Sequence, residues 1–222
     1  MFRDRSEAGR ELAGSLSHFG EANAMVLGLP RGGVPVAFEV AEALDAPLEV
    51  FVVRKLGVPG HEELAMGAVA SGGTRVLNRD VIAAAGIGEA QIEAVLRREL
   101  REVERRERAY RGDRAPIDPT GKAAILVDDG LATGSTMRAA VMALRERGPG
   151  AIAVGVPVSS PGFCAQFEPD VDEIVCLRTP EPFLAVGAWY DHFPQVSDEE
   201  VTELLAAAAR RWAERASPAE KG

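Results

Sequence analysis

The stretch Ala123–Met137, AAILVDDGLATGSTM, decides the fold of this chain. Its first residues are apolar, as in a short buried strand, and they run directly into two adjacent aspartates, Asp128 and Asp129. A loop of small and hydroxyl-bearing residues follows, and a helical pattern begins near Ser135. A strand, a small-residue loop and a helix in this order are typical of an α/β fold with a ligand at the carboxyl end of the strand.

The loop between this strand and helix has the composition of an anion site. Small residues let the backbone approach a ligand, and the N–H groups and dipole of the following helix favour a negative charge. Five residues are the candidates for holding a phosphate: Ala132, Thr133, Gly134, Ser135 and Thr136. The simpler alternative is a turn in which Ser135 or Thr136 caps the helix. Neither a Walker sequence nor a dinucleotide GxGxxG is present.

The two aspartates indicate that the ligand is more than a phosphate. Adjacent carboxylates repel each other and repel a phosphate, so they suit a ligand with a polyhydroxylated part that they can bind as hydrogen-bond acceptors. Ribose hydroxyls meet this need. The pattern therefore predicts a sugar phosphate, with its phosphate on the loop and its sugar on Asp128 and Asp129.

The rest of the chain alternates strands and helices around this motif. Short Val- and Ile-rich strands covered by helices predict an open, mainly parallel sheet in a single domain over 1–222. The expected strands are 25–29, 48–53, 123–127, 151–158 and 173–177. The expected helices begin at Ser6 and span 34–44, 89–108, 135–147, a short piece near Phe163, and 198–215. Residues 56–73 are expected to be a long loop, with a possible β-ribbon over 65–76. The last residues, SPAEKG, are expected to be disordered.

The helix over 89–108 carries six Glu and six Arg beside one apolar stripe. Pairs such as Glu93/Arg97, Glu102/Arg106 and Glu104/Arg108 have the favourable i,i+4 order. The balanced charge predicts a solvated face rather than a nucleic-acid surface. A role of this helix in packing or in a dimer stays open.

Composition sets the broad class. The formal charge of −9 argues against binding nucleic acid or an anionic membrane over the whole surface. No apolar run is long enough to span a bilayer, and the charged first residues do not form a signal peptide, so a cytoplasmic protein is expected. Cys164 and Cys176 are expected to be buried, reduced thiols. The three histidines show no metal-ligand spacing.

The motif VDDGLATGSTM resembles the phosphoribosyl pyrophosphate (PRPP) binding motif of type I phosphoribosyltransferases, residue by residue. The resemblance implies that fold with a flexible loop and a small hood, here about 178–195 with the C-terminal helix. Relative to that fold, this chain is expected to carry an unusually long helical insertion at about 88–111. It implies transfer of ribose 5-phosphate from PRPP to a nitrogenous acceptor, a nucleobase by default, with release of pyrophosphate. Mg²⁺ would be held mainly by PRPP, with Asp128 or Asp129 contributing through water. A homodimer is also expected.

The resemblance also assigns roles outside the motif. Arg31, Gly32 and Gly33 would form the pyrophosphate loop, in which the peptide bond is often cis in the family. Arg31, Asp128 and Asp129 would be the catalytic residues. Lys55, which with Arg54 ends the expected second strand, would also reach pyrophosphate, although a solvated strand end explains it equally well. His61 and Glu62 would lie in the closing loop.

The residues expected to bind the acceptor match the family less well than the residues expected to bind PRPP. The segment FLAVGAWYD resembles the hood of hypoxanthine-guanine enzymes, which makes Phe183, Leu184 and Trp189 the candidates for binding the acceptor. Those enzymes carry an aspartate where this chain has Ala132, and a lysine where this chain offers only Arg178. The acceptor therefore stays open. The alternative functions are a non-catalytic sensor of PRPP or a nucleotide, and a sugar-phosphate enzyme of another reaction type with the same phosphate site.

Overall fold

The computed structural model describes residues 1–112 and 114–216, and the expected disorder of the last residues falls outside them. Five parallel strands form the central sheet in the order β2-β1-β6-β7-β8. Their bounds are β1 Ala24–Gly28, β2 Leu48–Val50, β6 Ala123–Val127, β7 Ala151–Val158 and β8 Glu173–Arg178. The predicted open parallel sheet is confirmed.

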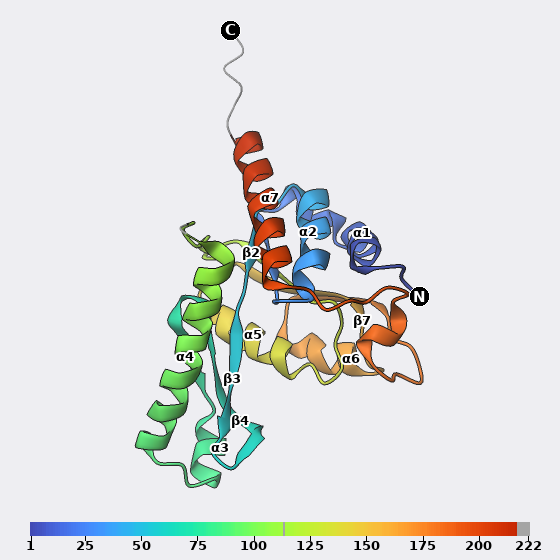
Figure 1. Cartoon of the computed structure of the whole chain (residues 1–222). Helices are drawn as coiled ribbons and strands as arrows, with labels where there is room; N and C mark the ends of the chain where they lie inside the picture. Colours follow the sequence, from blue (N-terminus) through green and yellow to red (C-terminus); the bar gives the residue numbers. More distant parts are fainter. Residues whose placement is uncertain (113, 217–222) are drawn as a thin grey trace.

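Helices cover both faces of this sheet (Figure 1). One face packs against α1 Arg5–Ser15, α2 Gly33–Leu44 and α7 Asp198–Ala216; the other packs against α5 Ser135–Arg145 and α6 Phe163–Phe167. Alternate strand residues serve the two faces: Val26 and Ile125 belong to the first core, and Leu27 and Leu126 to the second. Burial on both faces explains why the strands are continuously apolar rather than alternating.

A second sheet occupies the region expected to be a long loop over 56–73, and the β-ribbon expected over 65–76 is part of it. It is antiparallel, in the order β3-β4-β5, with bounds β3 Val53–Val58, β4 His61–Ala70 and β5 Thr74–Leu77. The chain leaves the central sheet after β2, because Val52 pairs with Ser71 instead: the Val52 N–H donates to Ser71 Oγ at 2.9 Å. Arg54 and Lys55 therefore lie inside β3 and do not end the second core strand, so that prediction was wrong.

The charged helix is α4, Glu89–Arg111, which lies along the second sheet and also contacts α7 (Figure 1). The short helix α3, Arg79–Ala84, precedes it. All three predicted i,i+4 pairs are present. The charged face of α4 is not solvated throughout, however: Glu99 is buried, and its carboxylate accepts from Arg54 and Arg98, both at 2.8 Å.

Short 3-10 helices complete the connections: η1 Ser17–Glu21, η2 Ser71–Gly73, η3 Glu168–Asp170 and η4 Val186–Trp189. None of the helices in the described part of the chain is both long and apolar enough to cross a membrane.

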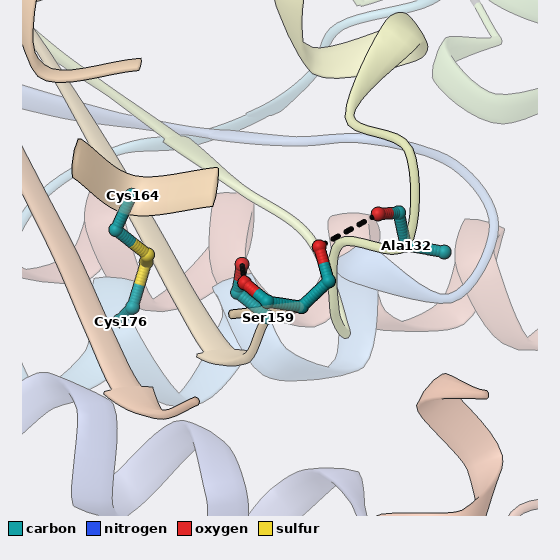
Figure 2. Close-up of a disulfide and its surroundings, with 5 residues drawn as sticks. Ala132, Ser159, Cys164 and Cys176 are labelled. Carbon is teal, nitrogen blue, oxygen red and sulfur yellow. Dashed lines mark hydrogen bonds between the residues drawn. A yellow bond between two sulfur atoms is a disulfide. The ribbon is translucent and has the colours of Figure 1, made fainter. Parts of the chain in front are cut away.

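The two cysteines form a disulfide, which corrects the expectation of buried, reduced thiols. Cys164 on α6 and Cys176 on β8 are bonded, and both are half-buried (Figure 2). Their Cα atoms lie 6.6 Å apart, within the range that a disulfide bridges. The bond ties α6 to the edge strand of the central sheet.

Candidate active site

The loop after β6 is held in place through its backbone. The Leu131 N–H donates to the Val158 carbonyl at 2.9 Å, and the Ser160 N–H donates to the Leu131 carbonyl at 3.0 Å. Ser160 Oγ also donates to the Ala132 carbonyl at 2.9 Å (Figure 2). These bonds anchor the start of the loop to the end of the neighbouring strand β7.

Gly134 is the N-cap of α5, with φ of +63°, and within the described residues no side chain caps this helix. The alternative in which Ser135 or Thr136 acts as the cap is therefore wrong. Thr133, Ser135 and Thr136 are exposed, so their hydroxyls remain available to a ligand. A helix start whose first N–H groups have no side-chain partner is a site that favours an anion.

The two aspartates lie at the end of β6 and interact with each other. Asp128 Oδ1 accepts the backbone N–H of Asp129 at 2.9 Å. Burial raises the pKa of Asp128 well above its usual range, and the neighbouring Asp129 charge adds to the effect. Burial also raises the pKa of Asp129, although Arg5 opposes the rise. A close, desolvated carboxylate pair of this kind is characteristic of functional sites.

The segment Pro30–Gly33 packs directly on the aspartates. A Cβ atom on Gly32 would lie 2.1 Å from Asp129 Oδ2, and one on Gly33 would lie 2.6 Å from the Val127 carbonyl oxygen. Only glycine permits these approaches. The Pro30–Arg31 peptide bond is cis, as expected for a pyrophosphate loop.

These elements enclose one cleft of about 590 Å³. Arg31 lies on its wall, with Nη1 at 3.7 Å from Asp198 Oδ1 at the start of α7. The lining residues are Arg5, Leu29, Pro30, Arg31, Gly32, Asp128, Asp129, Thr136, Val186, Phe193, Pro194, Gln195 and Val196. The cleft therefore brings together the predicted aspartates, Arg31 and Gly32 of the predicted pyrophosphate loop, and Thr136 of the predicted phosphate loop. Thr133 and Ser135 line a separate hollow instead.

Comparison with known proteins identifies the family. The model of the phosphoribosyl transferase domain matches residues 5–177. The chain belongs to the phosphoribosyl transferase domain family. Two Mycobacterium tuberculosis proteins, from strains CDC 1551 and H37Rv, are named "Putative phosphoribosyl transferase" and are 48% identical over 214 residues. The match covers 96% of this chain but 48% of each relative, so the chain spans about half their length.

A solved structure agrees in fold. The crystal structure of TT1426 from Thermus thermophilus superposes with a TM-score of 0.86 at 41% identity, and the match covers 93% of this chain and 98% of that one. A purine phosphoribosyltransferase from Pyrococcus horikoshii is similar at 17% identity, with a TM-score of 0.45; that match covers 87% of this chain and 92% of the other.

Lys55 does not lie on the cleft wall with Arg31 in this phosphoribosyl transferase domain. It lines two smaller hollows beside the predicted phosphate loop. Thr136 also lines one of them, of about 370 Å³, and Ser135 lines the other, of about 290 Å³. Its Nζ lies 3.2 Å from Glu63 Oε2. Lys55 is therefore placed nearer the loop predicted to hold the 5′-phosphate than the loop predicted to hold pyrophosphate. His61 and Glu62 are exposed at the start of β4.

The hood brings different residues to the cleft from those expected. Phe183 packs beside an apolar cluster that includes Phe2 and Tyr190, Leu184 is 83% exposed, and the buried Trp189 Nε1 has no hydrogen-bond partner in the described residues. None of the three lines the cleft, which the hood closes instead with Val186 and residues 193–196. The role of Phe183, Leu184 and Trp189 in binding the acceptor stays a prediction.

Arg178 also lies outside the cleft lining. Its guanidinium stacks 3.7 Å from the Phe2 ring centroid, and its Nη2 donates to Glu11 at 2.9 Å. The cation that ends β8 is therefore engaged by the N-terminal segment of the chain.

Besides the cleft residues of the hood, two residues that contact Asp129 were missed from the sequence. Arg5 donates to Asp129 Oδ2, and the Tyr190 hydroxyl donates to the Asp129 carbonyl at 2.6 Å. One local signal pointed to Arg5. It occupies the first turn of α1, where the helix dipole disfavours a cation, so another partner had to stabilise it.

Proposed function

We propose that this chain transfers the ribose 5-phosphate group of PRPP to a nitrogenous acceptor and releases pyrophosphate. The observation that carries the proposal is the meeting of three elements at one cleft: the uncapped start of α5, the acidic pair and Arg31. Each suits a different part of PRPP. Family membership over residues 5–177 supports the same reaction.

Each element would have a distinct task. The backbone N–H groups and hydroxyls of residues 132–136 would hold the 5′-phosphate, while Asp128 and Asp129 would accept hydrogen bonds from the ribose hydroxyls. Arg31 would bind the departing diphosphate with its planar fork of donors, whereas Lys55, which lines the hollows beside residues 133–136, would add positive charge on the 5′-phosphate side. Most of the rate enhancement would then come from positioning and electrostatic stabilisation.

A magnesium ion fits this donor set only as a partner of the substrate. Within the described residues no group of three or more His, Cys, Asp and Glu could hold a metal ion, and Asp129 Oδ2 is already engaged by Arg5. Mg²⁺ prefers to keep waters and bind substrate phosphates, so Asp128 or Asp129 would reach it through water. When bound, the ion would neutralise charge on the diphosphate.

Isothermal titration of PRPP with Mg²⁺ into the wild type, Asp129→Asn and Asp80→Asn tests the proposal. Asp80 is exposed on α3 and away from the cleft, so its variant controls for the loss of one negative charge. We expect binding by the wild type and the Asp80 variant and at least tenfold weaker binding by Asp129→Asn, about 1.4 kcal/mol or more.

A screen of nucleobases and other nitrogen acceptors for pyrophosphate release then tests turnover. Binding of PRPP without release for any acceptor would favour the sensor alternative. No binding by the wild type would overturn the PRPP site itself.

A further inference from the structure

We propose that Arg5 is the positioning residue of this site: from outside the PRPP motif, it orients Asp129 and keeps its carboxylate ionised for the ribose. The inference rests on the proposed function. It concerns a contact between the first turn of α1 and the end of β6, 124 positions apart in the chain.

Arg5 binds only one of the two carboxylate oxygens of Asp129. Arg5 Nε and Nη2 both lie 2.8 Å from Oδ2 of Asp129. Within the described residues, Oδ1 of Asp129 has no hydrogen-bond partner of its own. One oxygen therefore fixes the carboxylate, and the other is available to accept a hydroxyl of the sugar.

The third guanidinium nitrogen of Arg5, Nη1, and a contact with an aromatic ring hold the guanidinium in place. Arg5 Nη1 donates to the Pro194 carbonyl at 2.8 Å, and the guanidinium lies 3.7 Å from the centroid of the Phe193 ring. The Arg5 side chain is only 10% exposed and that of Asp129 15%. A lysine could not make these contacts together, because its ammonium is a single point of charge without a planar fork.

The N-terminal segment and the hood hold Arg5 as one unit. Phe2 forms a parallel bridge with Tyr190, and the His192 N–H donates to the Arg3 carbonyl at 2.9 Å. The Tyr190 hydroxyl in turn donates to the Asp129 carbonyl. The segment that would face the acceptor is thus linked through Arg5 to the aspartate that would face the ribose.

Stability alone does not account for this pair. Two ions removed from water cost desolvation energy that their attraction often only balances, so a buried ion pair is weak evidence for a purely stabilising role. Ionisation of Asp129 is also opposed by burial. The charged groups around it are Asp128 at the end of β6, Arg5 on α1 and Arg31 across the cleft, with the Tyr190 hydroxyl on its carbonyl. Of the two cations, only Arg5 contacts the carboxylate.

The test compares Arg5→Met with Arg10→Met by titration of PRPP and Mg²⁺ between pH 5 and pH 9. Arg10 lies on the same helix, is half exposed and bonds Glu39, so it controls for loss of a charge from α1. We expect Arg5→Met to bind PRPP about 10- to 100-fold more weakly at neutral pH, the loss expected for a hydrogen bond to a charged group. Its affinity should recover as the pH rises, because Asp129 without its cation needs a higher pH to ionise. A pH profile for Arg5→Met that matches the wild type would overturn the proposal.

A second measurement needs no ligand and uses the conservative variant Arg5→Lys, which keeps the positive charge. Carboxyl-carbon NMR of the wild type should show Asp129 losing its proton at lower pH than Asp128, and Arg5→Lys should move the Asp129 midpoint upward. An Asp129 titration that is unchanged in Arg5→Lys would overturn the role of Arg5. If the wild type binds no PRPP, the proposed function fails, while the NMR result still decides whether Arg5 controls Asp129.

Discussion

Replacing Gly134 by alanine tests whether the start of α5 has the shape described above. Gly134 has φ of +63°, and a Cβ there would lie 1.8 Å from Cε2 of Phe163 on α6. The left-handed conformation costs a non-glycine residue about 1–2 kcal/mol. Forcing the Phe163 ring aside adds about 1–3 kcal/mol, as for other overpacked cores. We therefore expect Gly134→Ala to lose about 2–5 kcal/mol of unfolding free energy.

Gly148 provides a matched control for this change. Its φ is +65°, and a Cβ there would meet nothing within 4 Å, so Gly148→Ala isolates the conformational cost of about 1–2 kcal/mol. Each kcal/mol corresponds to about 2–4 °C in Tm for a domain of 150–250 residues. Differential scanning calorimetry of both variants should therefore place Gly134→Ala lower by roughly 2–12 °C, the steric term alone.

Equal Tm values for the two variants would refute the reasoning, because they would mean that Phe163 does not pack on the phosphate loop. The double variant Gly134→Ala, Phe163→Ala separates the terms further. It should show a favourable coupling of at least about 1 kcal/mol if the ring is the obstacle. Titration of inorganic phosphate into Gly134→Ala should also show weaker binding than into Gly148→Ala, because only the former distorts the anion site.

Three further changes have definite expected outcomes. Burial raises the pKa of Asp128, so the folded state loses stability when the pH rises above the pKa of an unfolded-state Asp. Asp128→Asn should therefore raise Tm at pH 7. The gain should vanish near pH 4, about the pKa of an unperturbed Asp. An equal gain at both pH values in a pH series of melts would contradict this. Reducing the bond between Cys164 and Cys176, 12 positions apart, should lower the free energy of unfolding by about 2–3 kcal/mol, and urea titration that shows no loss would contradict it. Tyr110→Phe removes a donor at 2.8 Å from Asp198, so chemical denaturation should show a loss of about 1 kcal/mol, and no change would mean that the bond is not formed in solution.

The central sheet could be predicted because its signals are local. Each strand is a short apolar run that ends at a turn, and the strand over 123–127 and the strand over 151–158 were placed with their observed bounds. The second sheet was harder to predict. The apolar run 48–53 continues through the point where the chain leaves the central sheet, and there Val52 bonds to Ser71, 19 residues further on. No periodicity in the run marks that break.

The disulfide illustrates the same limit. Cys164 and Cys176 have no spacing that indicates a pair, and composition suggested a reducing environment. They meet because β8 is the edge strand next to β7 and α6 is the short helix between those two strands. Only the topology of the sheet, and not the sequence between the cysteines, brings the two sulfur atoms together.

The candidate site likewise has a part that follows from contiguous sequence and a part that depends on contacts between distant residues. The acidic pair and the phosphate loop are contiguous, so their chemistry could be derived from one motif. By the proposal above, the charge and orientation of the Asp129 carboxylate depend on Arg5, 124 positions away, while Tyr190, 61 positions away, holds the Asp129 backbone carbonyl. Two adjacent aspartates at a desolvated strand end resist ionisation. A motif match therefore identifies where ribose would bind, but a distant arginine decides whether the acids there can accept its hydroxyls. A chain that kept the motif and lost this cation would retain the fold and, by this reasoning, lose affinity for PRPP at neutral pH.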